Sequence, residues 1–222
     1  MISPSFFGLR SASRWLLAAA ITAVPTVALA HPHVWVTSQT EVLYDDSQRI
    51  SGLRHIWTFD EGYSAYVTQG LDVNGDGVLS PDELQELAEL NATSLVDFDY
   101  FTEVKADGAA QSFGDPVDYG MVFEDDRATL TFTLPLLEPA RAANVLVLEV
   151  YDPTYFVSFR MDDGDDAVRL AGGPSGCATS ITRPSTVDIA EVQSLSEAFF
   201  EALTASSNFG DQFANRALIA CP

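Results

Sequence analysis

Two stretches near the start of the chain have the composition of paired β-strands. Residues 33–44 (HVWVTSQTEVLY) and residues 49–59 (RISGLRHIWTF) are rich in β-branched and aromatic residues, and the polar sequence DDSQ lies between them. Such residues favour strands, and a short polar segment between two strands favours a turn. The pattern therefore predicts a β-hairpin.

The following segment, residues 61 to about 97, has helical periodicity instead. Its apolar residues recur three or four positions apart, which places them on one face of a helix. A short helix would carry Tyr63, Tyr66 and Val67, and a longer one Leu84, Leu87, Ala88 and Leu95. The sequence LDVNGDGVLS separates the two. We interpret this segment as a helical insert.

From residue 100 the strand pattern returns. The segments FTEVK, AQSF, YGMVFE, ATLTFTLPL, NVLVLEVYD, YFVSFRMD and AVRLAG follow one another. Ser185 with Asp188 marks a helix start, and its apolar stripe is Val192, Leu195, Phe199 and Leu203. The segment NRALIAC reads as a final short strand. The chain is thus predicted to be a mainly β (α+β), antiparallel domain with a helical insert and one late C-terminal helix.

The first thirty residues have the features of a secretory signal. Arg10 and Arg14 precede the apolar run WLLAAAITAVPTVALA, which ends in the small-x-small pattern Ala28-Leu29-Ala30. We expect cleavage after Ala30, leaving residues 31–222 as a single periplasmic domain with the insert at about 61–97. The alternative is an uncleaved anchor. No later segment is long and apolar enough to insert into a bilayer.

The net charge indicates which classes of molecule the protein is unsuited to bind. The formal charge is −21, and loss of Arg10 and Arg14 would make it more negative. Nucleic acid and anionic lipid are disfavoured, because both require a basic surface. Dissolved cations would be attracted, although a general gain in solubility also accounts for such a charge.

The chain has two cysteines, Cys177 and Cys221. In an exported protein an even number favours a disulfide, here with a stabilisation of about 3–4 kcal/mol. A two-cysteine metal site is the weaker alternative, because no C-x-x-C spacing is present.

Residues 72–83 (DVNGDGVLSPDE) match the twelve-residue calcium loop of an EF-hand. That loop needs oxygen donors at positions 1, 3, 5, 7, 9 and 12 and glycine at position 6. Gly77 takes position 6. The predicted calcium ligands are Asp72, Asn74, Asp76, Val78 through its carbonyl, Ser80 and Glu83.

Simpler interpretations cover only parts of this loop. SPDE alone is a helix start, and NGDG alone is a hairpin turn. No second loop of this kind follows, since the acidic segment MDDGDDAV lacks the closing glutamate. A single extracellular loop belongs to the weak class, with dissociation constants of about 10⁻⁴ to 10⁻³ M. Its expected role is to brace the insert.

The new amino terminus would carry a second candidate metal site. After cleavage, His31 has a free α-amine beside its imidazole, and His33 points the same way on a strand. These nitrogens suit nickel, cobalt, zinc or copper. A tight hairpin would place His33 opposite Asp60 or Glu61, so the candidate set is His31, His33 and one of these carboxylates. The alternative is a solvated, frayed terminus.

Several motifs taken together resemble a known family. They are HPHVWV, HIWTFDEGYSAY, DVNGDGVLSPDEL, DFDYFTEVKADG and VYDPTYFVSF. They resemble a bacterial domain-of-unknown-function family whose members are described as the periplasmic component of an uncharacterised ABC-type transport system. The resemblance runs from residue 31 to about 159 and more loosely to 221. It implies an exported, non-enzymatic protein, often encoded beside genes assigned to nickel/cobalt or zinc transport.

Three functions compete at this stage. The first is a periplasmic metal-binding accessory protein that serves an inner-membrane transporter, with calcium bracing the fold. The second is a calcium-braced interaction module of a transporter, without transition-metal binding. The third is a copper oxidase of the histidine-brace type, which would need His31 and a second histidine. A serine hydrolase is disfavoured, because the chain contains no Gly-x-Ser-x-Gly motif.

Overall fold

The computed structural model describes residues 32–184 and 209–222. The predicted hairpin is present as β1 (Val34–Tyr44) and β2 (Ile50–Phe59). Thr40 lies opposite His55 in their antiparallel ladder. The carboxylate of Asp45 accepts hydrogen bonds from the backbone N–H groups of Ser47 and Arg49, which closes the turn. The hairpin therefore depends on a local side-chain cap as well as on strand propensity.

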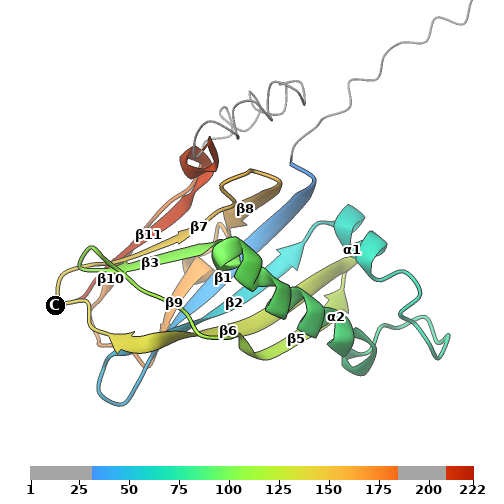
Figure 1. Cartoon of the computed structure of the whole chain (residues 1–222), viewed down its shortest axis with the longest axis horizontal. Helices are drawn as coiled ribbons and strands as arrows, with labels where there is room; N and C mark the ends of the chain where they lie inside the picture. The colour runs from blue at the N-terminus through green and yellow to red at the C-terminus, as the bar shows by residue number, and fades with distance from the viewer. Residues whose placement is uncertain (1–31, 185–208) are drawn as a thin grey trace, which may run out of the picture.

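The larger sheet is built around this hairpin (Figure 1). Its strand order is β5-β6-β2-β1-β8, and β9 also pairs with β1. The added strands are β5 (Val117–Glu124), β6 (Arg127–Ala140), β8 (Val157–Met161) and β9 (Val168–Ala171). Strands β8 and β9 run parallel to β1, along its first and second halves respectively. The predicted antiparallel arrangement thus holds for the rest of this sheet but not for these two pairings.

The smaller sheet has the order β10-β11-β7-β3-β4 and is antiparallel throughout the described residues. Its strands are β3 (Thr102–Ala106), β4 (Ala109–Ala110), β7 (Leu146–Val150), β10 (Ala178–Thr182) and β11 (Asn215–Ala220). Strand β11 is the predicted final strand. The predicted disulfide between Cys177 and Cys221 is present and ties the start of β10 to the end of β11.

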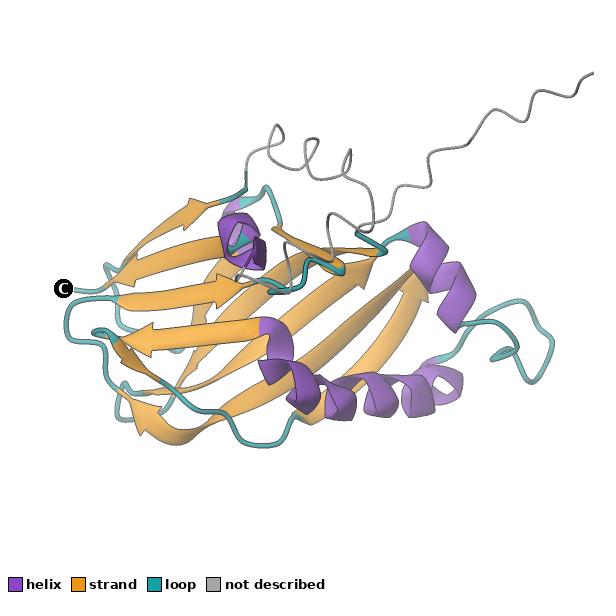
Figure 2. Ribbon diagram, turned by 45° about the horizontal axis from the view of Figure 1, so that its top comes forward, coloured by secondary structure: helices purple, strands orange, loops and turns teal. Residues whose placement is uncertain are grey.

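The helical insert is also present. Its helices are α1 (Glu61–Val67), α2 (Pro81–Ser94) and the 3₁₀ segment η1 (Leu95–Phe101). Leu84, Ala88 and Ala92 form the buried face of α2, which packs against β5. Figure 2 shows α2 crossing the strands of the larger sheet and leading through η1 into β3. Two short 3₁₀ segments, η2 (Asp165–Ala167) and η3 (Phe209–Phe213), complete the described helices.

Side chains from both sheets form one apolar core. The larger sheet contributes Val42, Leu53, Trp57, Phe132 and Leu134, and the smaller sheet contributes Val104, Leu148, Val150, Ala217 and Ile219. The fold is therefore mainly β with a few helices, as the sequence predicted. The predicted signal (1–30) and the late helix beginning at Ser185 lie outside the described residues. No helix in the described part of the chain is long and apolar enough to cross a membrane.

Candidate functional site

The loop that joins α1 to α2 is ordered by its own acidic side chains. Asp72 Oδ1 accepts hydrogen bonds from the backbone N–H groups of Gly75 and Asp76, and its Oδ2 accepts one from Gly77. Asn74 Oδ1 accepts from the Asp76 N–H at 2.8 Å. Asp76 Oδ1 accepts from the Val78 N–H at 2.8 Å. The side chains at positions 1, 3 and 5 of the predicted calcium loop thus fold back over its centre.

Two glycines make this tight course possible. Gly75 and Gly77 have φ values of +71° and +82°, a region in which residues with a side chain are strained. Gly77 holds position 6, where the EF-hand loop requires glycine for its sharp turn. Val78, whose carbonyl is the predicted ligand at position 7, is well exposed.

Glu83, at position 12, connects the two ends of the loop. Its Oε1 accepts a hydrogen bond from the Val73 N–H at 3.1 Å, and its Oε2 accepts from the N–H and hydroxyl of Ser80 at 2.9 and 2.7 Å. These bonds, the one from the Ser80 N–H first, lower the pKa of Glu83 below its ordinary value. Ser80 and Glu83 also form a capping box at the start of α2. The interpretation of SPDE as a helix start is therefore confirmed as well.

The predicted amino-terminal site is described only in part. His31 lies outside the described residues. His33 is exposed, its backbone N–H donates to the Phe156 carbonyl at 2.9 Å, and its ring lies 4.7 Å from the Phe156 ring. Within the described residues, Asp72, Asp76 and Glu83 of the loop included, no group of three or more His, Cys, Asp or Glu side chains is close enough to hold a metal ion.

The expected position of His33 opposite Asp60 or Glu61 is wrong. The ladder places Val36 against Phe59 and ends there, because Asp60 caps α1, which begins at Glu61. Asp60 lies beside Trp35: Asp60 Oδ2 accepts from the Trp35 N–H at 2.9 Å, and its Oδ1 accepts from the Tyr63 N–H at 3.0 Å. Glu61 forms an ion pair with Arg127 at 3.2 Å. Both carboxylates thus have structural partners.

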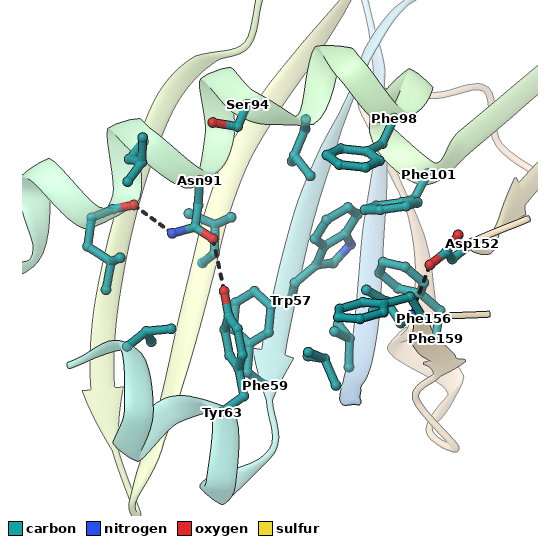
Figure 3. A pocket seen from close by; sticks show the side chains of 18 of the residues that line it. Trp57, Phe59, Tyr63, Asn91, Ser94, Phe98, Phe101, Asp152, Phe156 and Phe159 are labelled. Carbon is teal, nitrogen blue, oxygen red and sulfur yellow. Dashed lines mark hydrogen bonds between the residues drawn. The ribbon is translucent and has the colours of Figure 1, made fainter. Parts of the chain in front are cut away.

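An apolar pocket of about 680 Å³ lies beneath the helical insert. Strands β1, β2, β6 and β8 form its floor, α2 and η1 its roof, and α1 and the loop after β7 its sides. Figure 3 shows Trp57 of the floor facing Phe98 and Phe101 of the roof. Tyr63 of α1 donates through its hydroxyl to Asn91 Oδ1 of α2 at 3.3 Å, which joins one side to the roof.

Sequence reasoning did not find this pocket. Its apolar residues have the same periodicity as core residues, so no local sequence pattern distinguishes a residue that lines a pocket from one that fills the core. The structure distinguishes them by exposure: Leu90, Phe98 and Phe156 are 62%, 56% and 48% exposed at the edge of the pocket. Clustered exposed apolar side chains indicate a contact surface more often than isolated ones do.

Comparison with known proteins places the chain in a family. An uncharacterised protein of Haemophilus influenzae is 24% identical over 201 residues, covering 87% of this chain and 92% of the relative. An uncharacterised 15.5 kDa protein from the trpE 3′ region of Spirochaeta aurantia is 26% identical over 115 residues, covering 51% of this chain and 82% of the relative. The family model described as "Protein of unknown function (DUF1007)" matches residues 16–221, and the chain belongs to that family.

Proposed function

We propose that this protein is an exported, non-enzymatic accessory protein of a transition-metal transport system, and that a calcium ion braces its loop 72–83. The signal-like residues 1–30 support a periplasmic location, and so does the disulfide, because disulfides persist in oxidising compartments. The partner is an inner-membrane metal transporter, as the family resemblance implies. The protein does not itself insert into the membrane after cleavage of the signal.

The observation that carries the calcium proposal is the closure of the loop by Glu83. Its carboxylate contacts the N–H of Val73 at position 2 and of Ser80 at position 9, so position 12 lies beside the start of the loop and the cap of α2. The side-chain donors at positions 1, 3, 5 and 12 are all hard oxygen atoms, which is the chemistry that calcium prefers. When bound, the ion would supply a single positive centre for Asp72, Asn74, Asp76, Val78, Ser80 and Glu83.

The experiment separates calcium binding from helix capping. Glutamine can still complete a capping box, but it cannot supply a charged bidentate carboxylate. Calcium at ten times its dissociation constant is expected to raise the melting temperature of the parent protein by roughly 3–6 °C. Glu83→Gln should abolish this rise, whereas the control Glu86→Gln on the exposed side of α2 should keep it. An equal rise in both variants would overturn the proposal.

The transition-metal proposal concerns the terminus. His33 is hydrogen-bonded through its backbone to Phe156, just before β8, so a chain that begins at His31 would hold its free amine and imidazole two residues from this fixed point. Nitrogen donors of this kind suit nickel, cobalt, zinc or copper. Because Asp60 and Glu61 have other partners, His31 and His33 are the main donors in this proposal.

Calorimetry on a chain that starts at His31, with calcium present, tests this site. Stoichiometric binding of zinc, nickel, cobalt or copper should disappear in His33→Ala and when one residue is added before His31. The control Gln111→Ala, at a half-buried residue just after β4, should bind as the parent does. If no stoichiometric binding occurs, the second candidate holds: a calcium-braced interaction module without a transition metal.

A further inference from the structure

The pocket contains a buried hydrogen-bond donor without a partner. Trp57 is 2% exposed, and its indole Nε1 has no hydrogen-bond acceptor among the described residues. Figure 3 shows this nitrogen on the side of the ring that faces Phe101. The lining rings nearest to Trp57 are Phe101 and Phe159, with centroids at 6.5 and 4.9 Å. Aromatic faces accept hydrogen bonds only weakly, so the donor is not well satisfied inside the protein.

The charge of the lining excludes an acidic ligand. Among the described residues that line this pocket there is no lysine or arginine, and the carboxylate among them, Asp152, is 4% exposed. Asp152 is also fully engaged: its oxygens accept from the N–H and hydroxyl of Thr154, both at 2.8 Å, and from the Val157 N–H at 2.9 Å. An anionic ligand would therefore find a negative charge and no cation. A neutral acceptor suits the site.

Size and shape complete the description of the ligand. A volume of about 680 Å³ lies within the range of small-molecule sites, about 300–1,000 Å³. Flat rings line the floor and roof, and Phe98 stacks on Phe101 at 5.3 Å with an angle of 20°. We propose that this pocket binds a small, neutral, apolar molecule with a conjugated ring and a carbonyl oxygen, and that the carbonyl accepts the hydrogen bond of Trp57. The observations that support this ligand site are separate from those that support the two proposed metal sites.

The ligand reaches Trp57 from the open edge of the pocket. The indole nitrogen is buried, so its acceptor must enter between the lining rings. Phe98 at that edge is 56% exposed and stacks on Phe101, so entry of the ligand requires this stacked pair to move apart. A protein partner that only covered the edge would leave Trp57 unpaired, and this favours a molecule small enough to enter.

Three fluorescent naphthalene dyes test the proposal. Prodan is neutral and carries a ketone, N-phenylnaphthylamine is neutral and lacks a carbonyl, and anilinonaphthalene sulfonate is anionic. We expect saturable one-to-one binding of prodan to the folded protein. We expect weaker binding of the dye without a carbonyl, and the weakest binding of the anionic dye.

Two variants locate the binding. Trp57→Phe keeps an aromatic ring but removes the donor, so the affinity for prodan should fall about 3- to 10-fold while that for N-phenylnaphthylamine changes less than about 2-fold. Phe98→Asp places a charge at the exposed edge and should weaken both neutral dyes about tenfold or more. The control Leu137→Asp, at a residue that is exposed and does not line the pocket, should change neither.

Each other outcome overturns a defined part of the proposal. Absence of saturable prodan binding, or equal binding by Phe98→Asp, would exclude this pocket as a small-molecule site and leave its edge as a protein-contact surface. An equal effect of Trp57→Phe on both neutral dyes would exclude recognition of the carbonyl. Circular dichroism of each variant shows that the fold is retained. Phe98→Asp keeps the test informative if Trp57→Phe does not fold.

Discussion

His55 Nδ1 lies 3.1 Å from the hydroxyl oxygen of Thr40, its neighbour across the β1–β2 ladder. On the other side of the ring, Nε2 lies 3.4 Å from the hydroxyl of Thr102 at the start of β3. His55 therefore connects the two sheets through neutral partners. It is fully buried, and burial lowers its pKa to about 3. The imidazole is neutral in the folded protein, and both of its ring nitrogens face threonine hydroxyls inside the core, so His55 is a core residue.

The first prediction is a loss of stability in mild acid. The pKa of His55 is about 6.5 in the unfolded chain and about 3 in the folded protein, so between these values the unfolded chain binds a proton that the folded protein does not. The free energy of unfolding should fall as pH decreases from about 6.5, by up to about 1.4 kcal/mol per unit. Urea denaturation between pH 7.5 and 5 measures this slope.

Two variants assign the slope to His55. His55→Gln can keep hydrogen bonds to both threonines but does not titrate, so the slope should largely disappear. His33→Gln removes an exposed histidine and should leave it unchanged. Equal slopes in the parent protein and in His55→Gln would contradict the prediction.

The second prediction concerns Asn215, which joins the sheets through its side chain. Its Oδ1 accepts from the Met161 N–H at 2.9 Å, and its Nδ2 donates to the Phe159 carbonyl at 2.7 Å. Asn215 is completely buried, so Asn215→Ala would leave both backbone groups of β8 without partners. The free energy of unfolding should fall by about 2–4 kcal/mol. Urea denaturation of Asn215→Ala and of the exposed control Asn144→Ala, which should differ little from the parent protein, checks this.

The third prediction concerns the close approach of η3 to the loop after β7. The Gly210 N–H donates to the Pro153 carbonyl at 2.9 Å, and a Cβ on Gly210 would overlap the Asp152 carbonyl oxygen and lie 2.6 Å from Pro153. Gly210→Ala should therefore destabilise the protein by about 1–3 kcal/mol or more. Gly120→Ala is the matched control, because nothing lies within 4 Å of its added Cβ. Similar melting temperatures for both variants would contradict the prediction and would show that the loop after β7 moves away from the added methyl group at little cost.

The fourth prediction concerns the disulfide. Cys177 and Cys221 are separated by 44 positions, and the bond restricts that length of chain in the unfolded state. Loop-closure entropy gives a stabilisation of about 4 kcal/mol. Replacing both cysteines with serine should lower the free energy of unfolding by about 2–4 kcal/mol, because the β10–β11 ladder still holds the ends together. An unchanged midpoint of urea unfolding would mean that the ladder alone fixes the carboxyl end.

Local features of the fold could be predicted from sequence, and long-range ones could not. The hairpin, α1, α2 and the loop 72–83 depend on residues close together in the chain, so composition and spacing were sufficient. The parallel pairing of β1 with β8 and β9 joins segments more than 100 positions apart in the chain. No local sequence pattern indicates such a pairing. Asp60 was expected to face His33, yet it caps α1, because a carboxylate preceding a helix finds unpaired backbone N–H groups there.

The candidate functional site also has a part that the sequence could predict and a part that it could not. The twelve-residue pattern of the loop could be proposed from sequence because EF-hand ligands are contiguous, and calcium binding there stays a prediction. The pocket could not, since Trp57, Asn91 and Phe156 come from three separate elements. Trp57 looked like any strand residue. Only the missing acceptor for its indole nitrogen distinguishes it from the other residues of the apolar core.

The last prediction connects the loop with the pocket. Loop 72–83 joins α1 to α2, and both helices line the pocket, where Tyr63 of α1 bonds to Asn91 of α2. A calcium ion that fixes the loop would also fix the separation of the two helices. Calcium is therefore expected to raise the affinity for prodan about 3-fold or more, and prodan to raise the affinity for calcium by the same factor, since coupling between two binding equilibria is reciprocal.

Paired titrations measure this coupling. Prodan is titrated with excess calcium and with a chelator, first in the parent protein, then in Glu83→Gln and in the control Glu86→Gln. The calcium effect should vanish only in Glu83→Gln, whose affinity for prodan should match that of the calcium-free parent protein. If calcium raises the melting temperature but leaves prodan binding unchanged, the loop braces the insert without controlling the pocket. If prodan affinity responds to calcium equally in all three proteins, the ion acts somewhere other than Glu83.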